Sequence, residues 1–152
     1  MARYFFDSSA LAKRYHPEAG TPKVLSIFSE PRRELRISEL SFLEVQSVFA
    51  MKVRSGVIGR AEAAVQRARL IADIAAGEME VCSMTADIFA TAGQLIGRHS
   101  FSHRLRTLDA LQLAMAIDLS SQGLLDRFVV ADKALGQVAA LEGLVVLNPE
   151  TP

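Results

Sequence analysis

The chain has 152 residues, of which 50% are hydrophobic and 22% charged, and its formal net charge is zero. This length and composition predict one domain with an ordinary core, and they exclude an intrinsically disordered protein. The zero net charge excludes a polycation that holds nucleic acid by bulk charge, although a local basic face remains compatible with it.

The N-terminus lacks the apolar core and small-residue cleavage site of a signal peptide. No stretch approaches the roughly 18 apolar residues that cross a bilayer. The single cysteine, Cys82, cannot form an internal disulfide and lies in a strand-like run, so we expect a buried thiol. These features predict a soluble, cytoplasmic protein in a reducing compartment.

In the first half of the chain, apolar runs and helical periodicity predict two strands and four helices. In chain order these are a strand at 2–6, helices at 8–15 and 20–29, a strand at 35–38, and helices at 39–56 and 59–77. Ser8 or Ser9 can cap the first helix. Pro17, Pro31 and Gly56 mark the ends of the first three.

The second half predicts three strands and three helices around one polar loop. In chain order these are a strand at 79–82, a helix at 85–97 capped by Thr85, a basic loop at 98–106, a helix at 107–123, a strand at 128–131, a helix at 133–141 and a strand at 144–147. Short, continuously apolar strands that alternate with helices indicate an α/β fold, with a mostly parallel central sheet flanked by helices on both faces. We expect one domain at 1–148 and a C-terminal tail at 149–152.

Helical spacing also predicts which side chains point inward. The helix at 20–29 would bury Val24, Leu25 and Phe28. The helix at 59–77 carries a longer apolar stripe, made of Ala64, Val65, Ala68, Ile71, Ala72 and Ala75.

Two acids directly follow apolar strands: Asp7 follows the first and Asp132 the fourth. In open α/β sheets, ligands bind at the carboxyl ends of the strands. If both strands are central, the two carboxylates share one rim of the sheet. Each could instead cap the helix that begins after it, and for Asp132 capping alone is the simpler interpretation.

Two further acids lie on apolar helix faces. Glu44 shares a face with Leu40 and Val48 at four-residue spacing. Burying an unpaired carboxylate costs about several kcal/mol, so such a residue needs a partner charge or a metal. Asp109 lies in the first turn of its helix and Leu113 continues its face, but the helix dipole alone also favours an acid there.

Two neighbouring acids compete for these roles. Glu39 lies at a helix start, where capping and the dipole explain it, so we favour Glu44. Asp118, nine residues after Asp109, is assigned to the surface.

Four converging carboxylates would repel one another, by about 4 kcal/mol for a pair about 4 Å apart at an effective dielectric of about 20. A hard divalent ion, Mg²⁺ or Mn²⁺, suits an oxygen-only ligand set. The chemistry suited to such a site is hydrolysis of a phosphodiester by metal-activated water.

Four segments resemble the motifs of PIN-domain proteins. YFFDSSALAKRY resembles the opening of the family, and SELSFLEVQSVFAMK resembles its second motif, with a helical glutamate. RTLDALQLAMAIDL is similar to the third motif in VapC-type toxins, and FVVADKAL resembles the fourth. The segments occur in family order and span nearly the whole chain.

The resemblance implies a ribonuclease that cleaves RNA with Mg²⁺ or Mn²⁺, commonly forms a homodimer, and is held inactive by a cognate antitoxin. By motif match, the catalytic and metal-binding site comprises Asp7, Glu44, Asp109 and Asp132, and we expect Asp7 and Asp109 to be the closest ligands.

Two positions beside the acids also follow from the resemblance. Ser8 or Ser9 matches the small polar position after the first aspartate. Many relatives carry Ser or Thr two residues before the fourth acid, where this chain has Val130. Asp132 could therefore contact the metal through water, or it could only contribute to the electrostatic field of the site.

The segment RHSFSHRLR at 98–106 carries Arg98, Arg104 and Arg106 and no acid. It could be a solvated loop, or it could contact the RNA backbone close to Asp109, since phosphate affinity comes mainly from Lys and Arg.

His99 and His103 have a spacing that suits zinc on a helix, but nothing nearby completes a ligand set, so we expect no zinc site.

Val45, Phe49 and Val53 form a further apolar stripe at four-residue spacing. It could pack in the core, or it could line a groove for an antitoxin segment or a dimer contact.

Two other classes of function remain open. A strand-end aspartate with Mg²⁺ also suits a phosphoacceptor or phosphatase, but D-S-S-A lacks the second acid that such sites need. A PIN-like fold that has lost catalysis and only binds RNA or protein is the other alternative, and Val130 leaves it open.

Overall fold

A five-stranded parallel sheet organises the chain, and the computed structural model describes all of its residues, 1–152. The strand order is β3-β2-β1-β4-β5, and every neighbouring pair is parallel. The strands are β1 Ala2–Phe6, β2 Arg33–Ser38, β3 Glu80–Cys82, β4 Arg127–Val129 and β5 Val146–Leu147. The first and fourth strands are therefore central neighbours, which meets the condition under which Asp7 and Asp132 share one rim of the sheet.

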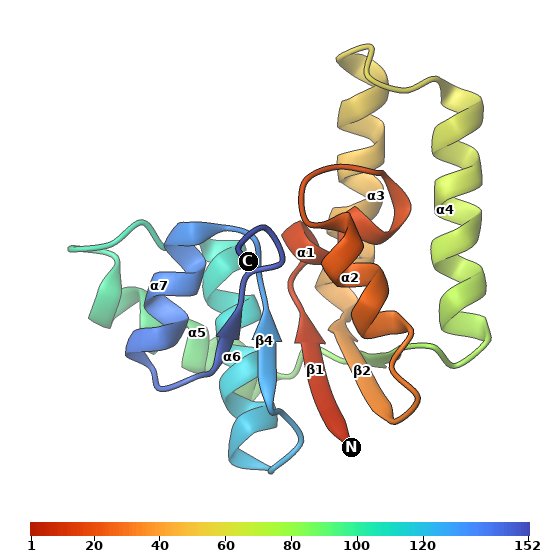
Figure 1. Ribbon diagram of the computed structural model, residues 1–152. Coiled ribbons are helices and arrows are strands. Elements are labelled where there is room, and N and C mark those ends of the chain that lie inside the picture. The colour runs from red at the N-terminus through yellow and green to blue at the C-terminus, as the bar shows by residue number, and fades with distance from the viewer.

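Seven helices cover the sheet (Figure 1). They are α1 Ser8–Tyr15, α2 Thr21–Phe28, α3 Glu39–Arg54, α4 Arg60–Ala75, α5 Ala86–His99, α6 Thr107–Ser121 and α7 Lys133–Leu141. Figure 1 shows α3 and α4 as a helical hairpin that extends beyond the sheet. The predicted α/β architecture, with helices on both faces of a parallel sheet, is confirmed.

Two apolar cores lie on opposite faces of the sheet, because successive strand residues point to opposite sides. Phe5 and Phe128 face α5, α6 and α7, and their rings stack with centroids 5.6 Å apart. Phe6 and Val129 face α1 to α4. The two central strands are thus buried on both sides, which explains why they are continuously apolar.

The inward face predicted for α4 is wrong. All six residues of the predicted stripe are exposed, and Val65 and Ile71 retain 58% and 40% of their accessible surface. Gln66 and Leu70 are buried instead. Asp73 helps to fix this orientation, because it pairs with Arg14 of α1 at 2.8 Å and accepts a hydrogen bond from the Tyr15 hydroxyl.

The structure also shows which side chains of α2 and α3 are buried and where α5 ends. In α2 the buried side chains are Val24, Ile27 and Phe28, and Leu25 is exposed. Val45 and Phe49 belong to the core, which settles the alternative for that part of the α3 stripe. Lastly, α5 continues through His99, so the loop is shorter than predicted.

Helix α1 has a different cap from either serine proposed. The Asp7 side chain accepts a hydrogen bond from the Ser9 backbone N–H and caps the helix.

No helix is both long and apolar enough to cross a bilayer.

Gly20 and Gly97 test how backbone conformation and free space decide the effect of adding a methyl group on stability. Gly20 has φ +88°, and a Cβ there would lie 3.1 Å from backbone atoms of Pro149. Gly97 lies within α5 with open space around its Cβ position. We predict that Gly20→Ala lowers the free energy of unfolding by about 1–2 kcal/mol, whereas Gly97→Ala raises it by about 0.5–1 kcal/mol. Urea unfolding measures both, and equal effects of the same sign would contradict the prediction.

Candidate functional site

The ends of β1 and β4 bring the predicted acids to one place. Phe6 and Val129 are partners in the parallel register, and the Asp7 N–H donates to the Val129 carbonyl at 2.9 Å. A pocket of about 190 Å³ lies above these strand ends. It is lined by Asp7, Ser8, Ser9, Glu44, Val48, Arg106, Asp109 and Asp132. All four predicted acids, from four separate segments, therefore line one pocket.

Asp7 is the most buried of the four acids, with 5% of its surface exposed. Its hydrogen bonds come from Ser8 and Ser9, the shortest from the Ser9 hydroxyl at 2.6 Å. Burial raises its pKa to about 6, and the negative charges of Glu44 and Asp109 add to that effect. Ionising Asp7 therefore costs more free energy in the folded protein than in water.

Ser9 and Ser8 hold different acids of the pocket. The Ser9 hydroxyl donates to Asp7 and accepts from the backbone N–H groups of Ala131 and Asp132, at 3.1 and 3.3 Å. It thereby joins the chain after β1 to the chain after β4. The Ser8 hydroxyl donates to Glu44 Oε1 at 2.9 Å. Both serines thus contact acids of the pocket, whereas the motif match assigned only one of them to the small polar position.

Glu44 is held by a buried polar network that the sequence analysis missed. Gln112, with 1% of its surface exposed, donates through Nε2 to Glu44 Oε1 at 3.3 Å and to the Ser41 hydroxyl at 2.5 Å. Its own Oε1 accepts from the Ser38 hydroxyl at 2.8 Å. Burial, followed by the Asp109 charge, raises the pKa of Glu44.

The sequence does carry a signal for Gln112. It is the one polar residue in the run Ala110–Ala116, three positions after Asp109 and so on the same helix face.

Asp109 and Asp132 have capping contacts as well as a place at the pocket. Asp109 Oδ2 accepts from the Arg106 backbone N–H at 3.1 Å and lies 3.7 Å from the Arg106 guanidinium. Asp132 Oδ1 accepts from the Leu135 N–H at 3.0 Å and caps α7, while its Oδ2 pairs with Arg104 at 3.2 Å. Capping therefore explains one contact of each acid, and both acids still line the pocket.

The donor set fits a hard divalent cation, because it consists of carboxylate and hydroxyl oxygens with no sulfur or imidazole. The buried Asp7, whose hydrogen bonds come from serines and not from a cation, supports the same fit. No three acidic, histidine or cysteine side chains are close enough to hold an ion together as they stand. Each carboxylate is instead turned toward its own donors, so holding an ion requires some of them to rotate inward.

Other candidate residues lie away from the pocket. Arg98 and His99 both pair with Glu142, which follows the far end of α7 from Asp132. Glu39 accepts from the Met84 N–H, and Asp118 is exposed on α6.

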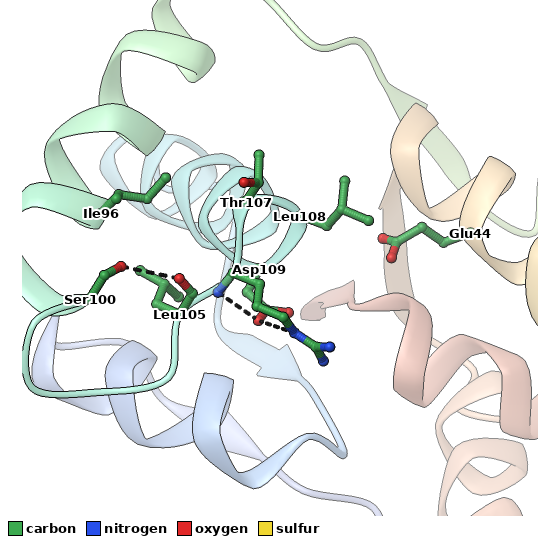
Figure 2. A pocket seen from close by; sticks show the side chains of 8 residues that line it. Glu44, Ile96, Ser100, Leu105, Thr107, Leu108 and Asp109 are labelled. Carbon is green, nitrogen blue, oxygen red and sulfur yellow. Dashed lines mark hydrogen bonds and ion pairs between the residues drawn. The ribbon is translucent and has the colours of Figure 1, made fainter.

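A second, larger cavity of about 690 Å³ adjoins the acids (Figure 2). It shares Glu44, Arg106 and Asp109 with the acid pocket. Its remaining lining residues are Ile96, Ser100, Leu105, Thr107 and Leu108.

Replacing Asp7 by the neutral isostere tests the cost of burying its charge, to which the neighbouring carboxylates add. The pKa of Asp7 is about 6 in the folded protein and about 4 in an unfolded chain. The folded state therefore binds the proton more tightly, so ionisation lowers stability as the pH rises from about 4 to about 6. We predict that Asp7→Asn raises the free energy of unfolding of the metal-free protein by up to about 3 kcal/mol at neutral pH, and much less near pH 4.

Urea unfolding in EDTA at about pH 4 and about pH 7.5 measures this difference, with Asp118→Asn as the exposed control. A variant that is no more stable than the wild type at the higher pH would contradict the assignment.

The PIN domain family model matches residues 4–141. No curated protein is similar enough in sequence to count as a relative.

Three solved structures illustrate the likeness in fold. VapC20 from Mycobacterium tuberculosis, a sarcin-ricin loop cleaving toxin, has a TM-score of 0.67 at 18% identity, covering 97% of this chain and 98% of its own. VapBC2 from Rickettsia felis, bound to a promoter DNA fragment, has a TM-score of 0.64 at 14% identity, covering 95% of this chain and 97% of its own. A toxin–antitoxin complex from Klebsiella pneumoniae has a TM-score of 0.62 at 19% identity, covering 96% of this chain and 97% of its own. At these identities the likeness shows the fold alone, but the family model spans nearly the whole chain, and the chain belongs to the PIN domain family.

Proposed function

We propose that this protein is a ribonuclease that depends on Mg²⁺ or Mn²⁺ and acts as the toxin of a toxin–antitoxin pair. The observation that carries the proposal is that four carboxylates, from four separate segments, line one pocket. Membership of the PIN domain family supports it.

In this proposal, Asp7 and Asp109 are the closest metal ligands, and Glu44 and Asp132 complete the site directly or through water. A bound divalent ion lowers the pKa of an attacking water and stabilises charge on phosphoryl oxygens. The chain's own contribution is to hold the acids in place. Ser9 fixes Asp7 against the end of β4, while Ser8 and Gln112 fix Glu44.

Arg104 and Arg106 are the proposed contacts to the RNA backbone. Their side chains retain 61% and 68% of their accessible surface, and each ends at an acid of the pocket. A phosphate that reaches the acids therefore comes within range of both guanidinium groups. Arg98 forms an ion pair with Glu142, so we propose only the other two arginines as RNA contacts.

A cognate antitoxin and a second copy of the chain are the proposed protein partners, in the cytoplasm. Apolar side chains that remain exposed on α3 and α4, among them Leu43, Val65 and Ile71, support a protein contact there. The Klebsiella pneumoniae relative is a toxin–antitoxin complex, and the Mycobacterium tuberculosis relative cleaves the sarcin-ricin loop.

Cleavage of a mixed RNA pool tests the proposed reaction. We predict cleavage with Mg²⁺ or Mn²⁺, none with EDTA, and a loss of at least about 100-fold in Asp7→Asn and Asp109→Asn, since each removes a ligand charge. Asp118→Asn, on the same helix as Asp109 but exposed, should keep full activity.

Full activity in folded Asp7→Asn would refute the metal site. RNA binding without cleavage by the wild type would instead favour a PIN-fold binding module.

The salt dependence of RNA affinity tests the two arginines. Each lost contact to a single-stranded phosphate should reduce the slope of log affinity against log salt by about 0.7. We predict this reduction for Arg104→Ala and for Arg106→Ala, and twice as much for the double variant. Arg98→Ala serves as the control and should leave the slope unchanged; unchanged slopes in all the variants would rule out a role for this segment in RNA binding.

A further inference from the structure

The basic segment 98–106 is attached to both ends of helix α7. At one end, Asp132 is the N-cap of α7, and its Oδ2 pairs with Arg104 at 3.2 Å. At the other end, Glu142 is the C-cap of α7 and contacts the His99 imidazole. The nine residues of α7 span about 14 Å. The segment is therefore fixed to this helix at two separate points.

The contact between His99 and Glu142 is the buried one of these attachments. His99 is the last residue of α5, with 8% of its surface exposed, and its Nε2 lies 2.6 Å from Glu142 Oε1. Arg98 reaches the same carboxylate from solvent, and its side chain keeps 57% of its accessible surface. The pair between Arg104 and Asp132 is exposed on the arginine side as well. Because water screens exposed ion pairs, His99 makes the stronger attachment.

The proton in this contact is assigned by the charge on Glu142. Burial opposes ionisation of Glu142, but the hydrogen bonds from His99 and Arg98 outweigh it and lower the pKa of the carboxyl group. Glu142 is therefore a carboxylate at neutral pH, and a carboxylate only accepts hydrogen bonds. His99 Nε2 accordingly donates. A hydrogen bond to an ionised acceptor is roughly twice as strong as one between neutral groups.

The backbone of His99 holds the turn that leads to the arginines. Its carbonyl accepts hydrogen bonds from the N–H groups of Ser102 and His103, at 3.1 and 2.8 Å. The Ser100 hydroxyl donates to the Leu105 carbonyl at 3.1 Å, and the Leu105 side chain is buried. Figure 2 shows how the chain turns back between Ser100 and Leu105. These bonds connect His99 to the stretch between the two arginines proposed to contact RNA.

We infer that the bond between His99 and Glu142 positions Arg104 and Arg106 for RNA binding. The inference rests on the proposed function, in which these arginines contact the RNA backbone. Rotation of the Asp132 carboxylate into the acid pocket breaks its pair with Arg104. The His99–Glu142 bond involves none of the four acids, so it still holds the segment when Asp132 has turned. His99 and Glu142 are thus positioning residues that act through the arginines.

The sign of the change in RNA affinity tests the inference, with Asp7→Asn as the non-cleaving background in the full chain. Glu142→Ala removes the bond and one negative charge, and loss of negative charge alone strengthens binding to a polyanion. We predict weaker binding instead. The slope of log affinity against log salt should fall by as much as about 1.4, because each of two arginine contacts contributes about 0.7.

Glu142→Gln is the matched control. It removes the same charge as Glu142→Ala, but its amide oxygen still accepts a hydrogen bond from His99. It should therefore restore the salt slope of the parent and bind RNA at least as tightly as the parent does.

Further variants separate positioning from the loss of an ion pair. His99→Leu removes the same bond from the other side and should reduce the slope as Glu142→Ala does, with no further loss in the double variant. Arg98→Ala removes the exposed pair to the same carboxylate and should leave the slope unchanged. In a chain that already carries Arg104→Ala and Arg106→Ala, Glu142→Ala should not weaken binding further.

Amide hydrogen exchange tests the position of the segment without RNA. In Glu142→Ala the amides of Ser102 and His103, which donate to the His99 carbonyl, should exchange at least about 10-fold faster, as expected when a hydrogen bond to a charged group is lost. The amide of Leu113, in the core of α6, should keep its exchange rate and thereby show that the variant is folded.

Unchanged exchange at both amides would overturn the inference, because the segment would then keep its place without the bond. Faster exchange with an unchanged salt slope would also overturn it, as would equal slopes in Glu142→Ala and Glu142→Gln. Failure of the proposed function has a different signature. In that case the wild type binds no RNA, while exchange at Ser102 and His103 still depends on Glu142.

Discussion

Negative charge gathered at the carboxyl ends of β1 and β4 opposes folding of this protein. Asp7 is buried, Glu44 is half-buried, and the pKa of each is raised, first by burial and then by nearby carboxylates. Replacing the acids by apolar or amide side chains would remove that cost. The pocket therefore resembles a functional site, where stability is lost for chemistry, more than a structural one.

Hydrogen bonds around the pocket determine how this charge is tolerated. Ser9 connects Asp7 to the chain that follows β4, and Gln112 connects Glu44 to the interior through two buried serines. On the outer side, Arg104 and Arg106 each meet one acid. The acids are thus fixed from inside by neutral donors and met from outside by exposed guanidinium groups, with a pocket of about 190 Å³ between them.

Much of the fold followed from the sequence, because buried parallel strands are continuously apolar and the punctuating Pro and Gly residues are easily read. The inward face of α4 did not follow from the sequence. Alanines lie on several sides of this helix, so more than one stripe could face the core. The chosen stripe held Val65 and Ile71, but Asp73 turns the helix the other way by pairing with Arg14. A polar contact between segments far apart in sequence is invisible to periodicity.

The acids of the pocket were predictable because each stands where a strand ends or where an apolar helix face admits a charge. Their hydrogen-bond partners were harder to find, since Gln112 acts through residues of β2 and α3. Likewise, the three arginines of one basic segment looked equivalent, yet α5 continues far enough to direct Arg98 toward Glu142. These distinctions depend on tertiary contacts and not on local spacing.

We expect one divalent ion, or more than one, to bind among these four carboxylates. Anomalous diffraction from crystals grown with Mn²⁺ can locate such an ion. We predict a manganese peak inside the acid pocket, within ligand distance of Asp7 and Asp109 oxygens. Crystals saturated with Mn²⁺ that show no peak there, with Asp109 and Asp132 still paired to Arg106 and Arg104, would contradict it.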